Sequence, residues 1–325
     1  MKKIILFVFA VFAILLSFLC IYLKNNTADV SKNYNITETV KYESKNVNYH
    51  NSVKNIPVTD KKSDYIEKKE NDTVIYWNSN WKYASFSEIH KSSVKLYKSK
   101  ANRKNKIICV NAGHGTAGGS RKRTYCHPDK SPKVTGGSTK AGSIKATSIN
   151  EGTALADGTK EADANLSLAL ILKNILLENG YDVLMIRETD NTYLDNIART
   201  VFANNNADCH ISVHYDGTET NKGFFYISVP NNQKYRNMEP VRTMWKEHNR
   251  LGKCIFDGVK SIGIKTLKNE TISVDLTQTS YSTVPSVDLE VGDKRTDHSP
   301  EYQTKTAFGI LKGLDYYFYK NLNIK

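Results

Sequence analysis

Short apolar runs alternate with amphipathic stretches beyond residue 105 of this chain. The apolar runs predict strands at residues 107–111, 181–186, 209–213, 223–229 and 286–291. Apolar residues at helical spacing predict helices at residues 161–177, 194–204, 244–262 and 302–319. Because strands alternate with helices, the pattern predicts an α/β domain with a largely parallel sheet.

The residues before this domain have a different pattern. Residues 25–71 are rich in Lys, Asn, Ser, Thr, Asp and Glu and lack a sustained apolar period, which predicts a mostly disordered stalk. Aromatic and aliphatic residues return at 72–100 and indicate a short ordered element that packs on the domain; a substrate-binding aromatic strip is the alternative. We therefore expect an N-terminal segment at 1–24, a polar stalk with this element at 25–105, and a folded domain at 106–325.

The first residues indicate where the protein resides. Residues 4–23 contain no charged side chain and follow Lys2 and Lys3. A helix of this length, at about 1.5 Å per residue, crosses a bilayer core of roughly 30 Å. The two lysines place the N-terminus in the cytoplasm and the remaining chain outside. No A-x-A site ends the run, which favours an uncleaved signal-anchor over a cleaved signal peptide and secretion. A lipoprotein attached at Cys20 is disfavoured because bulky Leu19 precedes it.

The charge of the chain narrows the choice of partner. Lys and Arg number 46 against 33 Asp and Glu, a formal net charge of +13 over 325 residues. This excess predicts a polyanionic neighbour: nucleic acid, a membrane surface or an acidic polymer. Export from the cytoplasm argues against nucleic acid, for which the sequence also has no recognised motif. An anionic cell envelope is therefore the favoured partner.

Polar residues stand where predicted strands end and a helix begins. His114 and His214 each follow a predicted strand, and Glu161 opens a predicted helix. Parallel sheets bind ligands at the carboxyl ends of their strands, so these residues can meet at one edge. Two imidazoles and a carboxylate, with one position left for water, form the ligand set of a hydrolytic zinc site. Glu290, at the end of the last predicted strand, suits a general base.

Each of these residues also has an ordinary structural interpretation. A histidine after a strand is commonly a hydrogen-bonded loop residue, and a glutamate in a first helical turn is commonly a surface charge favoured by the helix dipole. Glu290 can be a paired structural carboxylate. His127 with Cys126 is a weaker second metal candidate. These two lie in a long Gly/Ser/Thr/Lys-rich stretch at 116–157, which is either mobile or functional.

Five local motifs carry more information than the spacing. In chain order they are VNAGHG (110–115), KEADANLSLALILKNIL (160–176), RETD (187–190), ARTVFANNNADCHISVHYDG (198–217) and PSVDLEVGD (285–293). Together they resemble the zinc-dependent N-acetylmuramoyl-L-alanine amidases of the Amidase_3 family, over about residues 106–320. The resemblance implies a single twisted sheet flanked by helices on both faces and assigns residues 106–325 to a catalytic amidase domain.

The resemblance also implies a reaction and the residues that perform it. The substrate would be peptidoglycan, and the bond cut would be the amide between N-acetylmuramic acid and L-alanine. Zn²⁺ would be held by His114, Glu161 and His214, polarise the carbonyl and supply the attacking water. Glu290 would take the proton of that water and return one to the departing amine.

Some positions fit the family pattern and others depart from it. Asn165 and Arg199 occupy polar positions of the pattern, and we interpret them as lining the substrate cleft or orienting the fold. His210 stands where the family usually has an apolar residue and is interpreted as a core histidine or as one that contacts the metal ligands. The polar turn at 292–297 replaces an aromatic-rich turn, and the stretch at 116–157 is basic. These departures border the expected cleft and would alter substrate preference without removing a ligand.

We therefore expect an extracytoplasmic, membrane-anchored amidase that remodels the cell wall. A catalytically inactive peptidoglycan-binding scaffold and a zinc peptidase that cuts within the stem peptide are the alternatives. The sequence shows no wall-binding repeat, so targeting would rely on the anchor, the basic surface, or a regulatory or targeting protein. A compact anchored amidase also suits sporulation, where muramic lactam forms in the spore cortex. The Lys/Asn/Ile/Tyr-rich composition is compatible with a spore-former.

Overall fold

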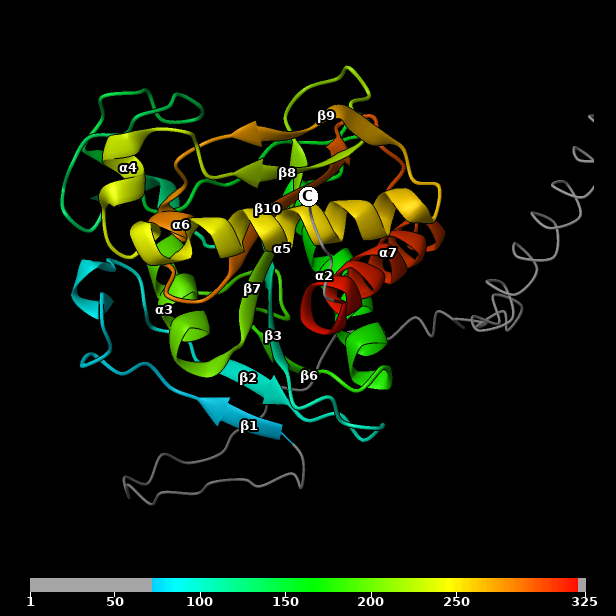
Figure 1. Ribbon diagram of the computed structural model, residues 1–325. Helices are drawn as coiled ribbons and strands as arrows, with labels where there is room; N and C mark the ends of the chain where they lie inside the picture. Colours follow the sequence, from blue (N-terminus) through cyan, green and yellow to red (C-terminus); the bar gives the residue numbers. More distant parts are fainter. Residues whose placement is uncertain (1–71, 321–325) are drawn as a thin grey trace, which may run out of the picture. The chain divides into compact units, whose positions relative to one another are not determined.

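The structure, a computed structural model, describes residues 72–320. Eight strands form one sheet in the order β1-β2-β6-β3-β7-β10-β8-β9 (Figure 1). Their bounds are β1 Asp72–Ile75, β2 Val94–Tyr97, β3 Ile107–Ala112, β6 Asp182–Met185, β7 Cys209–Asp216, β8 Phe224–Ser228, β9 Thr266–Ser273 and β10 Ser286–Asp293. Two further strands, β4 Arg123–Tyr125 and β5 Lys145–Thr147, form a separate antiparallel pair.

The centre of the large sheet is parallel and its flanks are mixed. β6, β3, β7 and β10 pair in parallel, with Ile108 opposite Cys209 and Val287 opposite Ile211. β8 pairs antiparallel to β10, and β2 pairs antiparallel to both β6 and β1. β9 pairs in parallel with β8. The expected α/β sheet is therefore present as a mixed sheet with a parallel core.

Helices cover both faces of the sheet. Their bounds are α2 Glu161–Glu178, α3 Asn196–Asn206, α4 Gln233–Asn237, α5 Val241–Ser261, α6 Thr277–Tyr281 and α7 Pro300–Tyr319. Successive side chains of a strand point to opposite faces. In β3, Ile108 and Val110 join the core under α2, α5 and α7, whereas Cys109 joins a second core under α3. This alternation explains why the first four residues of the strand, 107–110, are all apolar.

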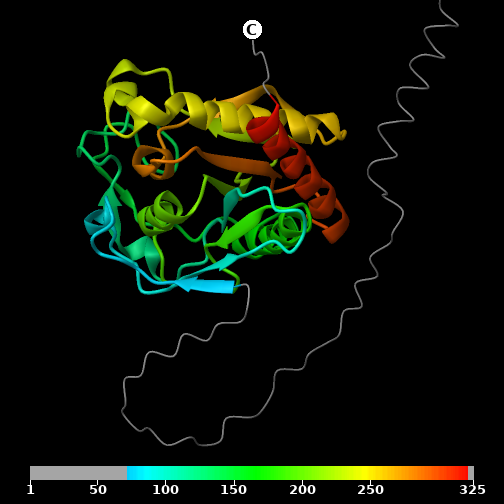
Figure 2. The ribbon, with the colours of Figure 1, turned by 60° about the horizontal axis from the view of Figure 1, so that its bottom comes forward.

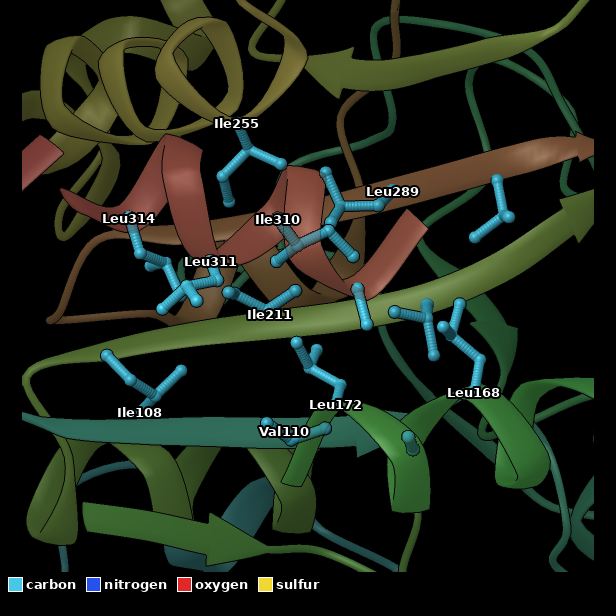
Figure 3. Close-up of a cluster of buried hydrophobic side chains, with 14 of the residues drawn as sticks. Ile108, Val110, Leu168, Leu172, Ile211, Ile255, Leu289, Ile310, Leu311 and Leu314 are labelled. Carbon is cyan, nitrogen blue, oxygen red and sulfur yellow. The ribbon is translucent and has the colours of Figure 1, made fainter. Parts of the chain in front are cut away.

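The main core lies between the sheet and helices α2, α5 and α7. Figure 3 shows Leu168 and Leu172 of α2 facing β3 and β7, and Ile310 of α7 approaching Ile211 from the same side of the sheet. All four side chains are fully buried, and each buried aliphatic side chain of this size contributes roughly 1.5–3 kcal/mol. Helices α5 (yellow) and α7 (red) lie against each other in Figures 1 and 2. The packing fixes the strands whose carboxyl ends carry the candidate site.

The aromatic segment at 72–100 belongs to the same folded unit. It supplies β1 and β2, which extend the sheet beyond β6. Trp77 and Trp81 each pack edge-on against Phe202 of α3, with ring centroids 5.5 Å apart in both pairs. These contacts make the segment an ordered element that packs on the domain.

The expected N-terminal anchor at 1–24 and the stalk at 25–71 lie outside the described residues. Among residues 72–320, no helix is both long enough and apolar enough to cross a membrane.

The long Gly/Ser/Thr/Lys-rich loop is ordered and is fastened to the body of the domain. Asp275, fully buried between β9 and α6, accepts hydrogen bonds from the Nε2 of His127 at 3.0 Å and the Nζ of Lys133 at 2.9 Å. The backbone N–H groups of Val134 and Thr135 donate to the same carboxylate at 2.7 and 3.1 Å. His127 is thus engaged in a structural contact, and the weaker metal candidate with Cys126 gathers no third ligand among residues 72–320.

We predict that Asp275→Asn destabilises the domain strongly. Removing one partner from a buried charge pair leaves the other charge unpaired, which costs about 3–5 kcal/mol. Here the unpaired groups would be Lys133 and, when protonated, His127. Urea unfolding at pH 7 measures the loss, and Asp129→Asn, in an exposed part of the same loop, is the matched control.

The stabilisation by Asp275 should also depend on pH. Burial raises the pKa of this carboxyl, but hydrogen bonds from His127, Thr135 and Lys133 outweigh burial and hold the pKa well below its usual range. The folded-state pKa lies below the unfolded value of about 3.9, so the contribution is complete above about pH 4 and declines as the pH falls further. The difference in unfolding free energy between wild type and Asp275→Asn should therefore shrink in acid. A pH-independent difference would contradict this account.

Candidate metal centre

Three side chains that are far apart in sequence converge at the carboxyl edge of the sheet. His114 Nε2 lies 2.8 Å from Glu161 Oε1. His214 Nδ1 lies 3.0 Å from the same oxygen and 3.1 Å from His114 Nε2. Within residues 72–320, this is the one group of three or more His, Cys, Asp or Glu side chains whose ligand atoms all lie within 4.8 Å of one another. Two ring nitrogens and one carboxylate oxygen aimed at a common point fit zinc, which prefers this donor set.

The backbone before and beside the site makes room for this convergence. His114 itself adopts a left-handed conformation with φ of 63° just after β3. A Cβ atom on Gly113 would lie 2.1 Å from Cε1 of His214, so only glycine lets the ring of His214 approach. The sequence AGHG therefore encodes a turn that brings two candidate ligands together.

Two buried arginines donate hydrogen bonds to the backbone carbonyls of this turn. The Nη2 of Arg199 donates to the carbonyl of His114 at 2.5 Å, and its Nη1 donates to that of Ala112 at 2.9 Å. The Nη2 of Arg187 donates to the carbonyl of Gly113 at 2.8 Å. Burial lowers the pKa of Arg187 to about 10 and that of Arg199 to about 9, so both stay charged at neutral pH. Arg199 is only 1% exposed and supports the backbone that carries His114.

Asn165 lies one helical turn after Glu161 on α2 and is fully buried. Its Nδ2 lies 3.4 Å from Oε1 of Glu161 and 3.5 Å from the carbonyl of Gly113. The structure thus places Asn165 beside the ligand cluster, where its amide links the carboxylate of α2 to the turn after β3.

Glu290 stands on β10 next to the cluster. In the parallel pairing of β10 with β7, Glu290 lies opposite His214. Burial raises the pKa of Glu290 well above its usual range, and the neighbouring Asp288 carboxylate raises it further. Its Oε2 is buried and has no hydrogen-bond partner among the described residues. A carboxylate in such surroundings holds a proton readily, as a general acid and base must.

Charges in the cluster balance one another. Burial raises the pKa of Glu161, but hydrogen bonds from His114 and His214 outweigh burial and hold the pKa well below its usual range. Burial lowers the pKa of His214, but Asp288 and then Glu161 outweigh burial and raise the pKa to about 9. In the absence of a metal, the cluster therefore keeps an ionised carboxylate and a proton on His214. A metal ion would displace that proton, as metals do when they bind histidine.

The sequence predicts the three candidate ligands and Glu290, and it marks Asn165 and Arg199, but it gives no indication of Arg187 or Asp288. Arg187 lies within the RETD motif, yet nothing in the motif indicates that its guanidinium binds backbone carbonyls. Asp288 was also missed, although strand alternation places residues 288 and 290 on the same face. Its Oδ2 lies 3.8 Å from Nε2 of His214. His210, by contrast, is a core histidine as predicted, and burial lowers its pKa to about 3.

An α/β sheet with a His, Glu and His cluster at the strand ends, beside a buried carboxylate, has the layout of a hydrolase site. The family model of N-acetylmuramoyl-L-alanine amidases, Amidase_3, matches residues 108–316, and the chain belongs to this family. The family acts on peptidoglycan and its members are hydrolases. No curated protein compared with the chain matches it.

Solved amidase structures share the fold. The amidase Ami1 of Mycobacterium abscessus, in its apo form, gives a TM-score of 0.52 at 21% identity and covers 66% of this chain and 98% of its own. Ami1 of Mycobacterium smegmatis gives 0.53 at 20% identity, with 67% and 98% covered. The CwlD amidase of Clostridioides difficile, in complex with the GerS lipoprotein, gives 0.46 at 21% identity, with 66% and 98% covered. At these identities, the first two structures establish the fold of the domain.

Proposed function

We propose that this protein is a zinc-dependent amidase that hydrolyses the bond between N-acetylmuramic acid and L-alanine in peptidoglycan. The convergence of His114, Glu161 and His214 beside Glu290 carries this proposal, in a chain that belongs to the Amidase_3 family. The donor atoms, their mutual distances and the orphaned oxygen of Glu290 all suit a metal hydrolase.

Each residue of the site has a distinct role in this proposal. His114 Nε2, Glu161 Oε1 and His214 Nδ1 would hold the zinc. Bound zinc supplies Lewis acidity toward the scissile carbonyl and makes water nucleophilic near neutral pH. Glu290 accepts a proton from the attacking water and returns a proton to the nitrogen of the departing L-alanine. The carbon–nitrogen bond breaks, leaving a carboxylate on the lactyl group and a free amine on the peptide.

We predict that removal of metal abolishes amidase activity and that zinc restores it. A chelator should lower the release of peptides by more than about 100-fold, because a Lewis acid contributes several kcal/mol to such reactions. Amine release from purified peptidoglycan measures the reaction, and circular dichroism shows whether the metal-free protein stays folded. Full activity in the folded, metal-free protein would refute zinc dependence.

Product analysis separates the amidase from the two alternatives. The amidase should yield glycan strands that lack the whole stem peptide, together with peptides that begin with L-alanine. A peptidase would leave part of the stem on the glycan, and an inactive scaffold would release nothing although it binds the polymer. Mass spectrometry of the soluble products distinguishes the three outcomes.

We further propose an extracytoplasmic location, with the uncharged run at 4–23 as a membrane anchor. Cleavage of this run and secretion remain the alternative, and immunoblotting of membrane and medium fractions separates the two. The net charge of +13 supports retention near an anionic wall.

A role in the spore cortex is part of the same proposal, supported by the composition typical of an AT-rich genome. We propose that a regulatory or targeting protein directs the enzyme, because the sequence has no wall-binding repeat. Analysis of muramic lactam in a deletion strain tests the cortex role, since cortex from that strain should lack the lactam.

A further inference from the structure

Two of the three ligands are held by the backbone of the loop that precedes α2. The Nδ1 of His114 lies 3.0 Å from the carbonyl oxygen of Asn150, which can only accept, so Nδ1 carries the hydrogen and Nε2 is free to bind a metal. The backbone N–H of Thr153 donates to Oε2 of Glu161 at 2.9 Å, which leaves Oε1 for the metal. Outer contacts of this kind fix the orientation of metal ligands.

The third ligand has a different outer partner. His214 turns its Nδ1 toward the cluster, so its ring hydrogen belongs on Nε2 when a metal is bound. That nitrogen faces the carboxylate of Asp288, whose Oδ2 lies 3.8 Å away. This is an ion-pair distance, longer than a direct hydrogen bond, so the attraction between the two groups is electrostatic.

A carboxylate at position 288 destabilises the folded domain. Its neighbours in β10, Val287 and Leu289, are fully buried and apolar. Its own side chain is 14% exposed, and its Oδ1 is buried without a hydrogen-bond partner in the described part of the chain. An unpartnered buried polar atom costs about 1–3 kcal/mol, and more when it is charged. The repulsion from Glu161 and Glu290 adds to this cost. An aliphatic side chain would suit the strand better, which indicates that the carboxylate serves the site.

We propose that Asp288 is a positioning residue of the metal centre. Its carboxylate faces the Nε2 hydrogen of His214, keeps the ring oriented with Nδ1 toward the metal, and strengthens Nδ1 as a donor. With zinc bound, the carboxylates of Glu161 and Asp288 would together offset its two positive charges. Glu290 is then left free to carry the proton of the reaction. This inference rests on the proposed zinc site.

Zinc affinity tests this role without relying on turnover. The full-length protein is compared with Asp288→Asn, which keeps an acceptor oxygen but no charge, and with Asp288→Leu, which keeps neither. Competition with a chromophoric chelator should show a loss of about 10-fold for Asn and up to about 100-fold for Leu, the range expected for partners of metal ligands. Glu219→Gln, at a 53% exposed carboxylate, removes the same charge elsewhere and should leave the affinity unchanged.

The cobalt-substituted protein provides a second readout that a purely structural role would not move. The visible spectrum of bound cobalt should change in both Asp288 variants, because the ring of His214 is held differently. An unchanged spectrum, or a zinc affinity of Asp288→Leu within about two-fold of wild type, would overturn the role of Asp288. If the wild-type protein itself bound no zinc, the proposed zinc site would fail first, and this inference with it.

Discussion

Glu290→Gln is expected to abolish turnover while zinc remains bound. The amide is nearly isosteric with the carboxyl group but cannot accept the proton of the attacking water. General base and acid catalysis contributes typically about 10²–10⁴-fold, so peptide release should fall by this factor. Glu290 lies outside the ligand cluster, so the zinc content of the purified variant should equal that of wild type.

Two measurements are needed on this variant. The release of L-alanine-terminated peptides from peptidoglycan reports catalysis, and elemental analysis reports the metal. Glu219→Gln serves again as the control for the loss of one carboxylate. Retained activity in Glu290→Gln would refute the proton-transfer role, and loss of zinc would place Glu290 among the ligands.

The parts of the fold that could be predicted from sequence are those buried on both faces. β3 and β7 begin at residues 107 and 209, as predicted, because both strands open with mostly apolar residues that are buried or partly buried. The sequence does not predict β9, because it is an edge strand with no continuous apolar run. Half of its residues, in TLKNETIS, are exposed. α6 is only five residues long and buries Gln, Thr and Ser, so it has no apolar period to recognise.

The candidate ligands of the site could be predicted from sequence, and so could the support from Arg199, but the backbone groups that contact the ligands could not. Each ligand belongs to a motif with a recognisable residue type. The carbonyl of Asn150 and the N–H of Thr153 are backbone groups, which any residue can supply, so no sequence pattern marks them. From its composition, the long loop at 116–157 that contains them is predicted to be either mobile or functional. In the structure, Asp275 fastens this loop to the domain, and two backbone groups of the loop contact two of the candidate ligands.

There is a physical reason why the candidate ligands can be recognised in the sequence while the backbone groups that orient them cannot. Metal ligation requires specific side-chain atoms, and those leave a signature in sequence. Orientation requires only a donor or acceptor at the correct place, and the fold decides which atom that is. Asp288 is intermediate between a recognisable ligand and an unrecognisable support. A charged residue between apolar neighbours in a buried strand can itself be noticed in the sequence as unusual.

Gly113→Ala should destroy the metal centre although Gly113 binds no metal. The new Cβ would lie 2.1 Å from Cε1 of His214, far inside van der Waals contact. The turn cannot retreat, because Arg187 and Arg199 donate hydrogen bonds to the carbonyls of Gly113 and His114. The ring of His214 must therefore move, and zinc affinity should fall by more than about 100-fold, beyond the loss expected from disturbing an outer partner.

Gly217→Ala is the matched control for this prediction. Gly217 lies three residues after His214, and a Cβ there would meet no atom within 4 Å. Both variants add one methyl group near the same strand, so a shared loss of zinc would point to a general effect on β7. Chelator competition and thermal unfolding should show that Gly217→Ala matches wild type, while Gly113→Ala stays folded and loses zinc. Wild-type zinc affinity in Gly113→Ala would mean that the turn is free to yield, and that the two arginines do not fix the distance between the histidines.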